Sequence, residues 1–546
     1  MKLVWTTLIA VSLCLVGSVG CTSFMRQPKE APENVQVDVP ETVGQTTRPH
    51  GLGSVAVESY ALVTGLAGTG SDPPPSQQRH LLLEEMKKRK VNDPNSWLAD
   101  GNTALVLVRA HLPPGVRKGD PVDIEVRVPS RSKTTSLEGG WLMETRLKEV
   151  AILGREVRSG HVRCLAEGPV LAESLSSDDG NKVASIRGTV LGGGVATKTR
   201  PLGLFLRSDH HSVSVSKLVG AAVNNRFDTY VHGKRQGAAT PKTDKFIELA
   251  IHPRYRHNLI RYLRVIEQIQ LRETTEQQLD RMKTLQGDLL IPATASLAAL
   301  KLEAIGEEAI ATLRQGLTSP SGEVRFYASE ALAYLDQADA AQHLADAVSE
   351  PAFRSRALNA LAAMSSVEAH DELTELLHVA SSETRYGAFR ALQNMNPRDP
   401  LLGHEALGGE IYLHQVASKG EPLVHFTRSR RPEVVLFGAD QPIETPLLVL
   451  IGKKLIVKSE NSSRIRVTRY TPGGDDVTRV CRPTVNELVR TLVEIEASYP
   501  EVVQTLHEAR SQGCLMSRLA FDAIPKTGRT YERMVDASVE EDMNLE

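Results

Sequence analysis

The alternation of apolar and polar residues organises the first large part of the chain, residues 54–271. Val122–Val128 alternates at every position, which is typical of a strand with one buried face. Apolar residues at helical spacing predict helices over Val213–Phe227 and Arg254–Leu271. Further strands are predicted at Ala104–Ala110, Leu142–Leu147, Lys182–Val190, Leu202–Leu206 and Phe246–Ile251. Mixed strands and helices predict an α+β region built of α/β layers.

Residues 293–398 have a different pattern, because strand signals stop and alanine and leucine dominate. Three stretches superimpose at offsets of 29 and 31 residues: Val324–Leu335, Phe353–Met364 and Thr384–Met395. A weaker copy, Thr294–Ile305, precedes them, and a linker helix is expected over 272–292. Two short helices in each unit of about thirty residues predict an all-α solenoid of HEAT-like repeats inserted into the chain.

Residues 399–526 return to strand patterns and then to two helices. The sequence Thr484-Val485-Asn486-Glu487 predicts a capping box at the start of a helix over Val485–Ile495. A second helix is predicted over Glu501–Ser511, followed by a strand over Leu515–Ile524. This C-terminal part is therefore also expected to be α+β, and the residues after it, 527–546, form an acidic tail.

The N-terminus has the pattern of a secretory signal over residues 1–20. Lys2 gives a positive charge, Leu3–Val16 is apolar and uncharged, and small residues lead to Cys21. A cysteine after Val-Gly is similar to a bacterial lipoprotein signal. Two outcomes stay open: lipidation of Cys21 with anchoring in the outer membrane, or plain cleavage. Residues 21–53 are rich in Pro, Thr, Glu and Gln and are expected to be a flexible tether.

Composition narrows the classes of function. The net charge of the 546 residues is −2, which does not favour nucleic acid as a partner. Five cysteines occur without a C-x-x-C pair, which argues against a zinc ribbon or a thioredoxin-like site. Cys481 and Cys514 either form a disulfide in an oxidising compartment or remain buried thiols.

Signals for catalysis are weak throughout the sequence. Val57–Gly70 ends in a glycine loop, but its spacing is G-x-x-G-x-G, and Pro73–Pro75 stands where a phosphate-binding helix would begin. Neither G-x-S-x-G nor H-E-x-x-H occurs. Asp209, His210 and His211 lack a third ligand at metal-site spacing. We therefore expect no catalytic residue, no cofactor and no metal site, and we expect that the chain is not an enzyme.

One candidate interaction surface lies on the repeats. Arg325, Arg354 and Arg385 stand at the same position of the three copies. Two interpretations stay open. The guanidinium groups either are solvated or cap neighbouring carbonyl groups, or they form a basic ridge that binds an acidic partner.

Four blocks of the sequence resemble the flagellar basal-body P-ring protein family. The glycine-ended strand matches the family at Tyr60, Leu62, Val63, Gly65, Leu66, Gly68, Thr69 and Gly70. The second block matches at Leu112, Pro113, Pro114, Gly119, Val122, Asp123, Ile124 and Val126, and then at Ser136, Leu137, Gly139, Gly140, Leu142, Thr145 and Leu147. The third matches at Ala221, Val223, Asn224, Arg226 and Phe227, and residues 484–524 are similar to the family's final helices and strand.

The resemblance implies a non-catalytic structural subunit of the periplasmic P ring, a bushing around the flagellar rod that serves motility. It implies a homo-oligomeric ring, the rod or L-ring proteins and peptidoglycan as partners, and no nucleic acid. Two departures are the lipid anchor at Cys21 and the absence of the family's central "R-TG-x-(I/V)-V-x-G" pattern near the repeats. The alternative is a lipid-anchored envelope adaptor that binds a protein partner through the repeats.

Overall fold

The computed structural model describes residues 42–531, apart from 154–155, 177–184, 232, 439, 453 and 472. The signal, Cys21, most of the expected tether and the tail beyond residue 531 lie outside the described residues. The tether boundary at residue 53 is wrong, because helix α2 (Val43–Thr46) and strand β1 (Thr47–His50) form within it. β1 pairs antiparallel with β9 (Leu202–Leu206), and this pairing supplies the backbone partners that a tether lacks.

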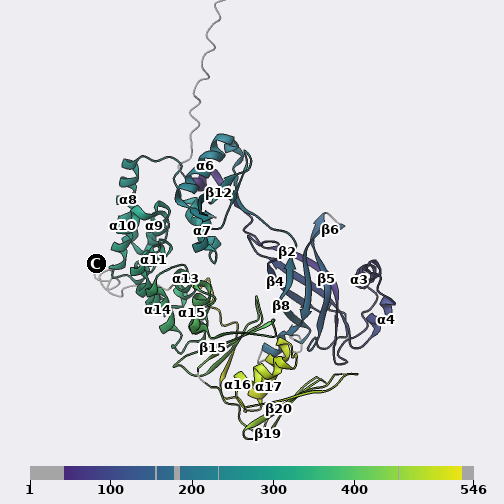
Figure 1. Cartoon of the computed structure of the whole chain (residues 1–546). Coiled ribbons are helices and arrows are strands. Elements are labelled where there is room, and N and C mark those ends of the chain that lie inside the picture. The colour runs from purple at the N-terminus through teal and green to yellow at the C-terminus, as the bar shows by residue number, and fades with distance from the viewer. Residues whose placement is uncertain are drawn as a thin grey trace, which may run out of the picture. The chain divides into compact units, whose positions relative to one another are not determined.

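The largest sheet has the strand order β4-β3-β2-β5-β6-β8-β7, and an additional β4–β8 pairing closes it on itself (Figure 1). The predicted alternation in β4 is confirmed, since Val122, Ile124 and Val126 are buried and their neighbours face outward. The strands are β2 (Val55–Thr64), β3 (Ala104–Leu112), β4 (Pro121–Arg127), β5 (Trp141–Leu153), β6 (Glu156–Pro169), β7 (Leu171–Ala172) and β8 (Arg187–Ala196). Helices α3 (Gln77–Lys88) and α4 (Pro94–Ala99) pack on Leu62 and Leu105 of this sheet.

The glycine loop after β2 is part of this packing. Gly70 donates a backbone hydrogen bond to the carbonyl of Gly101 at 2.8 Å. A Cβ atom at Gly70 would lie 2.1 Å from the carbonyl oxygen of Thr103, so only glycine allows this close approach. The loop thus closes against the turn before β3.

A second sheet of order β1-β9-β13-β12 carries helix α6 (Val213–Arg226). Its other strands are β12 (Ala239–Pro241) and β13 (Phe246–Leu249), and β10 (Asp228–Val231) pairs with β11 (Lys234–Gly237). The long helix expected from Arg254 to Leu271 is wrong in its bounds. Pro253–Tyr255 is a 3₁₀ turn, and α7 spans only Leu259–Glu267 because the Asn258 side chain caps it.

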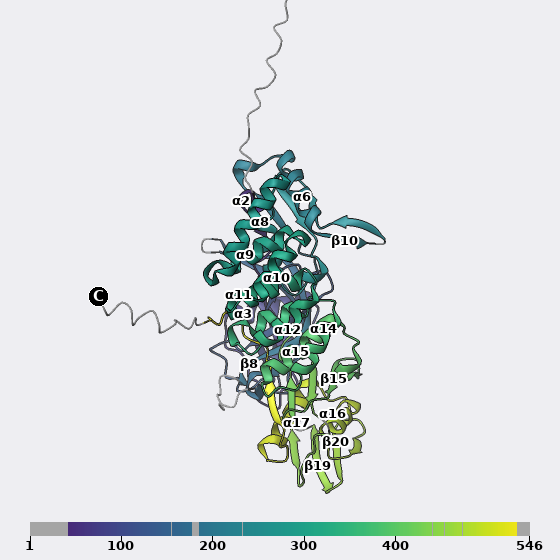
Figure 2. The same ribbon diagram turned by 90° about the vertical axis from the view of Figure 1, so that its left-hand side faces the viewer.

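The middle of the chain is helical from α8 to α15. The helices pack in pairs of neighbours: α8 with α9, α10 with α11, α12 with α13 and α14 with α15 (Figure 2). Successive pairs also contact one another, through α9, α11, α13 and α15 in turn, and through α8 with α10 and α12 with α14. The hydroxyl oxygens of Ser321, Ser366 and Ser381 cap the N-termini of α11, α14 and α15. The helices are α8 (Thr275–Leu290), α9 (Pro292–Ile305), α10 (Ile310–Leu317), α11 (Gly322–Tyr334), α12 (Ala341–Ala347), α13 (Pro351–Leu361), α14 (Val367–Leu376) and α15 (Ser382–Met395).

The C-terminal part contains two sheets and two helices. The first sheet has the order β14-β15-β17-β16-β22, and the second has the order β18-β19-β20-β21. The strands are β14 (His404–Leu407), β15 (Ile411–Val416), β16 (Leu423–Phe426), β17 (Glu433–Phe437), β18 (Leu448–Ile451), β19 (Leu455–Asn461), β20 (Arg464–Arg469), β21 (Val477–Cys481) and β22 (Arg518–Phe521). Leu171, Leu175 and Leu191, from the β7–β8 part of the closed sheet, belong to the same apolar core as this C-terminal part.

Helices α16 (Val485–Glu494) and α17 (Tyr499–Ser511) occur where helices are predicted, but the capping box at Thr484 is wrong. The Thr484 hydroxyl donates to the Asn486 Oδ1 atom at 2.6 Å instead of accepting from the helix backbone. At α17, Glu501 accepts a hydrogen bond from the backbone N–H of Ser498 at 2.8 Å. Cys481 and Cys514 are buried free thiols, and burial raises the pKa of both.

Candidate functional site

A groove of about 720 Å³ lies along the helical segment. The turn at Pro253–Tyr255 and the start of α7 form one wall, and the C-terminal ends of α11, α13 and α15 form the other. A neighbouring pocket of about 590 Å³ shares His257, Asn359 and Asn394 with it. Through these shared residues the two pockets are continuous, and together they form the groove.

Positive charge converges on the junction of the two pockets. Arg256 lines the first pocket, and Arg390 and Arg430 line the second. Among the residues that the structure describes, none of these three arginines forms an ion pair with a carboxylate. The pKa of His257 is lowered to about 4 by burial and by the charges of Arg256, Arg430 and Arg390.

Asp399, which lines the groove, and Asp336, which binds the groove residue Arg254, are both already paired. Arg254 Nη2 lies 2.8 Å from Asp336 Oδ2, and His370 Nε2 lies 2.8 Å from Asp399 Oδ2. These acidic groups therefore do not neutralise the guanidinium groups at the junction. The groove keeps a net positive field, which favours an anionic ligand.

Two amide side chains complete the groove. Asn359 and Asn394 are half-buried, and no hydrogen bond of either side chain to another described residue is found. Each amide offers an N–H donor and a carbonyl acceptor. This is the pairing that a peptide group on a ligand would complete.

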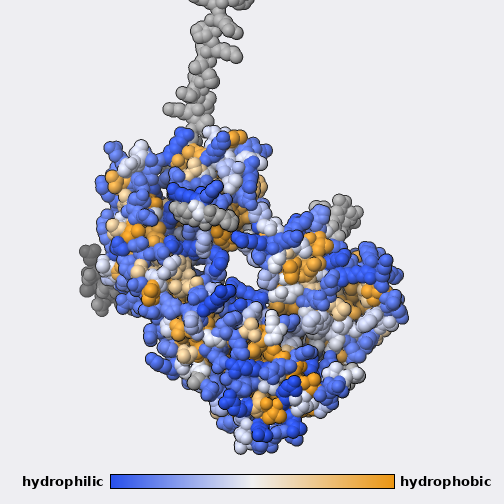
Figure 3. Space-filling model, viewed as in Figure 1, coloured by the Kyte–Doolittle hydropathy of each residue, from blue (hydrophilic) through white to orange (hydrophobic). Residues whose placement is uncertain are grey.

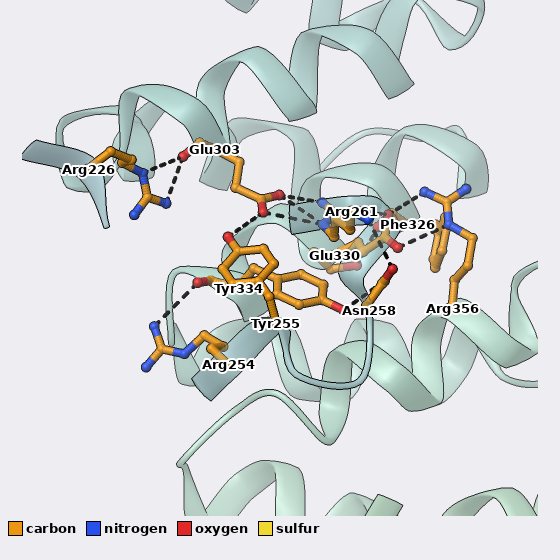
Figure 4. A network of polar contacts seen from close by, with 11 residues as sticks. Arg226, Arg254, Tyr255, Asn258, Arg261, Glu303, Phe326, Glu330, Tyr334 and Arg356 are labelled. Atoms are coloured by element: carbon orange, nitrogen blue, oxygen red, sulfur yellow. Dashed lines mark hydrogen bonds and ion pairs between the residues drawn. The ribbon is translucent and has the colours of Figure 1, made fainter. Parts of the chain in front are cut away.

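A buried ionic network fixes the wall that contains α7 (Figure 4). The Arg261 guanidinium lies between Glu303 of α9 and Glu330 of α11, and Arg261 Nη1 is 2.6 Å from Glu330 Oε2. Arg356 of α13 also binds Glu330, and the Tyr255 hydroxyl donates to Glu303 Oε1 at 2.7 Å. Arg261, Glu303 and Glu330 are each at most 6% exposed, so the turn and α7 are held firmly against the helices.

The two carboxyl groups of this network differ in their electrostatics. Burial raises the pKa of Glu303 above its ordinary value, although Arg261 opposes the shift. Burial acts in the same direction on Glu330, but the charges of Arg261 and Arg356 together outweigh it and hold the pKa of Glu330 below its ordinary value. Glu330 is thus the more firmly ionised member of the pair.

The structure places the three repeated arginines outside the groove. Arg325 donates to the carbonyl oxygens of Ser319 and Pro320, and Arg354 donates to the carbonyl oxygen of Val348. Arg385 is fully buried and donates to the carbonyl oxygen of Glu421 at 2.7 Å. The basic ridge expected from these three residues does not form, because their guanidinium groups cap backbone carbonyls, which is the other interpretation of the pattern.

Sequence reasoning missed the groove residues, although the repeat contained a signal for them. Glu330, Asn359 and Arg390 stand at the same position of the three copies, as do Tyr334, Ala363 and Asn394. All of these except Glu330 line the groove, and Glu330 binds α7 beside it. Arg256 and Arg430 come from other segments, so no local pattern connects them to the repeats.

Two absences concern only the described residues. No cluster of three His, Cys, Asp or Glu side chains able to hold a metal ion occurs among them. His210 lies against Asp209, while His211 Nε2 is 3.1 Å from the carbonyl oxygen of Leu206. Within the same ranges, no helix combines the length and the apolar composition that crossing a bilayer requires.

Comparison with known proteins finds similarity in the first half of the chain. Residues 43–280 match the family model described as "Flagellar P-ring protein". This range contains the closed sheet, the second sheet, α6 and α7, and it covers three of the four resembling blocks. The match ends at residue 280, so it does not cover the helices from α9 onward or the resemblance expected at residues 484–524.

The individual relatives are likewise named flagellar P-ring proteins. The flagellar P-ring protein of Bradyrhizobium sp. strain BTAi1 is 29% identical over 227 residues, which cover 39% of this chain and 55% of the relative. Those of Shewanella baltica and Thermotoga maritima are 31% and 28% identical, over 28% and 38% of this chain and 39% and 60% of their own lengths. The chain thus spans about half the length of the curated relatives that it matches.

These relatives are named for a flagellar ring component and not for an enzyme, in agreement with the expectation that this chain is a structural protein. The expected resemblance to the flagellar P-ring protein family is confirmed over residues 43–280.

Proposed function

We propose that the chain is a structural subunit of a P-ring-like assembly in the periplasm. The observation that supports it is the family match over residues 43–280, which includes the whole closed sheet. The proposal includes ring formation by further copies of this chain. It also includes contact with the flagellar rod, L-ring proteins or peptidoglycan, and anchoring through a lipid on Cys21.

The outer face of the closed sheet supports self-assembly. Leu165 of β6 and Val195 of β8 are direct cross-strand partners, and they are 38% and 46% exposed. Trp141 and Met143, on the same face of β5, are 40% and 46% exposed. Figure 3 shows apolar residues gathered over this part of the molecule. Exposed apolar surface of this kind favours contact between copies.

Electron microscopy of the purified mature chain tests this proposal. We expect rings, together with co-fractionation of the chain with isolated basal bodies and reduced motility after deletion. Monomers at every concentration, combined with normal motility of the deletion strain, would contradict it. Mass spectrometry of the mature N-terminus decides separately between lipidated Cys21 and plain cleavage.

A second proposed function is that of a protein-binding scaffold, with α9–α15 as a HEAT-like solenoid. The groove favours it, because its charged lining contains two amide side chains, Asn359 and Asn394, for which the described residues offer no hydrogen-bond partner. A photo-crosslinking residue at Met395, which lines the groove, tests it in cells. We expect one defined protein adduct that is absent when the crosslinker stands on the exposed strand residue Arg464.

A further inference from the structure

We propose that the groove binds an extended, acidic segment of a partner protein. The inference rests on the proposed scaffold role and adds the chemistry of the partner and the residues that recognise it. It places recognition on Arg256, Arg390 and Arg430, with Asn359 and Asn394 between them.

The repeat position occupied by Glu330, Asn359 and Arg390 gives the first argument. In the first copy, Glu330 forms an ion pair with Arg261 of this chain's own α7. In the second and third copies, the equivalent side chains Asn359 and Arg390 face the open groove. The surface that holds α7 therefore continues past it into an open pocket, of which residues 524–527 of the C-terminal segment form another wall. The side chain at this repeat position changes from an acid to an amide to a base. A peptide segment that lies along this surface would pair with Arg390 if it carries carboxylates at that position.

Charge gives the second argument. Arg256 comes from the turn before α7, Arg390 from α15 and Arg430 from the loop between β16 and β17. Burial and their charges together depress the pKa of His257.

Asp399, which lines the groove, pairs with His370, and Asp336, which binds the groove residue Arg254, is likewise paired. Asp123 and Asp522 partly offset the charge of Arg430, but neither forms an ion pair with it. An anion bound among the three arginines would therefore reduce the repulsion between their like charges.

The lining selects a peptide among anions. The Asn359 and Asn394 amides match the N–H and C=O groups of an extended backbone. Met364, Met395 and Val367 line the same groove and offer apolar contact to a side chain. Carboxylates, backbone amides and apolar side chains occur together in an acidic polypeptide, whereas a free phosphate has no group that would contact the apolar lining.

Binding of defined peptides to the purified full chain tests the inference. The probes are a fluorescein-labelled peptide of alternating Glu and Ser and a matched peptide in which Gln replaces Glu. We expect anisotropy to report binding of the acidic peptide only, weakening as salt is added. Arg390→Gln combined with Arg430→Gln should weaken this binding about tenfold or more, because two charge-assisted contacts are lost.

Two substitutions of opposite charge at Asn359 distinguish an effect of charge from misfolding, because misfolding would weaken binding in both variants. Asn359→Asp should weaken binding of the acidic peptide and Asn359→Lys should strengthen it, because the two changes alter the charge of the groove in opposite directions. Arg464→Gln, at the exposed first residue of β20, removes a positive charge elsewhere and should leave binding unchanged. Thermal unfolding of each variant shows that it is folded.

Three results would overturn the inference: equal binding of the acidic and neutral peptides, no effect of the arginine and Asn359 changes, or preferred binding of a soluble peptidoglycan fragment over the acidic peptide. If the crosslinker at Met395 still captures a defined protein while the acidic peptide does not bind, the scaffold role stands and the acidic-segment inference fails. If neither occurs, both fail.

Discussion

The carboxylate of Asp123 accepts a hydrogen bond from the backbone N–H of Arg430 at 2.7 Å, across 307 positions of sequence. Its other oxygen accepts from the backbone N–H of Gly192 at 2.9 Å. Arg430 has φ +69°, in the left-handed region that non-glycine residues rarely occupy. One side chain of the closed sheet thus helps to hold a strained loop residue whose own side chain lines the groove.

Asp123→Ala should lower the free energy of unfolding by about 1–2 kcal/mol, because two backbone N–H groups lose a charged acceptor. It should also weaken binding of the acidic peptide, since the loop around Arg430 loses its support. Urea unfolding measures the first effect and anisotropy the second. Asp123→Asn keeps one acceptor and should show a smaller loss, so equal losses in the two variants would contradict the explanation.

Arg261→Met should destabilise the chain by about 3–5 kcal/mol, because the buried Glu303 would lose its ion-pair partner and Glu330 would keep only Arg356. A triple variant that also changes both glutamates to leucine should recover part of this loss, since no buried charge then remains at those two positions. Urea unfolding of both variants checks the prediction. A triple variant less stable than Arg261→Met would show that the loss of stability comes from packing and not from uncompensated charge.

His425 should make the chain sensitive to mild acid. Its pKa is lowered from 6.5 to about 3 by burial and by the charge of Arg390, and its Nε2 atom accepts a hydrogen bond from Ala523. Between pH 6.5 and pH 3 the unfolded chain binds a proton that the folded chain does not, so stability falls as the pH falls through this window. At pH 5 this histidine contributes about 2 kcal/mol of that loss.

His425→Gln removes this titration. Its unfolding free energy should therefore decline less than that of the wild type between pH 7 and pH 5, whatever its value at pH 7. His507→Gln, on α17 and outside the groove, is the matched control and should leave the slope unchanged. Parallel pH profiles of the wild type and His425→Gln would contradict the prediction.

Leu165→Glu together with Val195→Glu should abolish self-association without unfolding the monomer, because both side chains are exposed on the outer face of the closed sheet. Analytical ultracentrifugation and electron microscopy measure the effect. Lys198→Glu places a negative charge on a neighbouring exposed loop and should leave assembly intact. Rings formed by the double variant would show that copies contact through another surface.

The C-terminal segment after β22 should protect the helical segment. Tyr531 stacks on Phe353 with ring centroids 4.7 Å apart, and Arg529 pairs with Glu383. Tyr531→Ala should speed trypsin cleavage after Lys526 and Arg529, since the segment loses its aromatic contact. Limited proteolysis followed by mass spectrometry measures the rate, and an unchanged rate would show that the stacking does not hold the segment.

Much of the local structure could be predicted from sequence. The alternation in β4, the helix α6 and the alanine-rich helices follow from periodicity, which depends only on residues close in sequence. The helix expected over Arg254–Leu271 and the cap at Thr484 were wrong for local reasons: Asn258 starts α7 later, and the Asn486 side chain takes the Thr484 hydroxyl. The early strand β1 was missed because its partner β9 lies far along the chain.

The sequence by itself determined the local elements, the helical repeat and the resemblance of residues 43–280 to flagellar P-ring proteins, because periodicity and glycine or proline spacing are properties of neighbouring residues. Only the tertiary structure decided which arginines cap backbone carbonyls and which line the groove. It turned Arg325, Arg354 and Arg385 onto backbone carbonyls, and it brought Arg256, Arg390 and Arg430 together from three elements. The electrostatic field of a site depends on distances in space, which the order of residues does not contain.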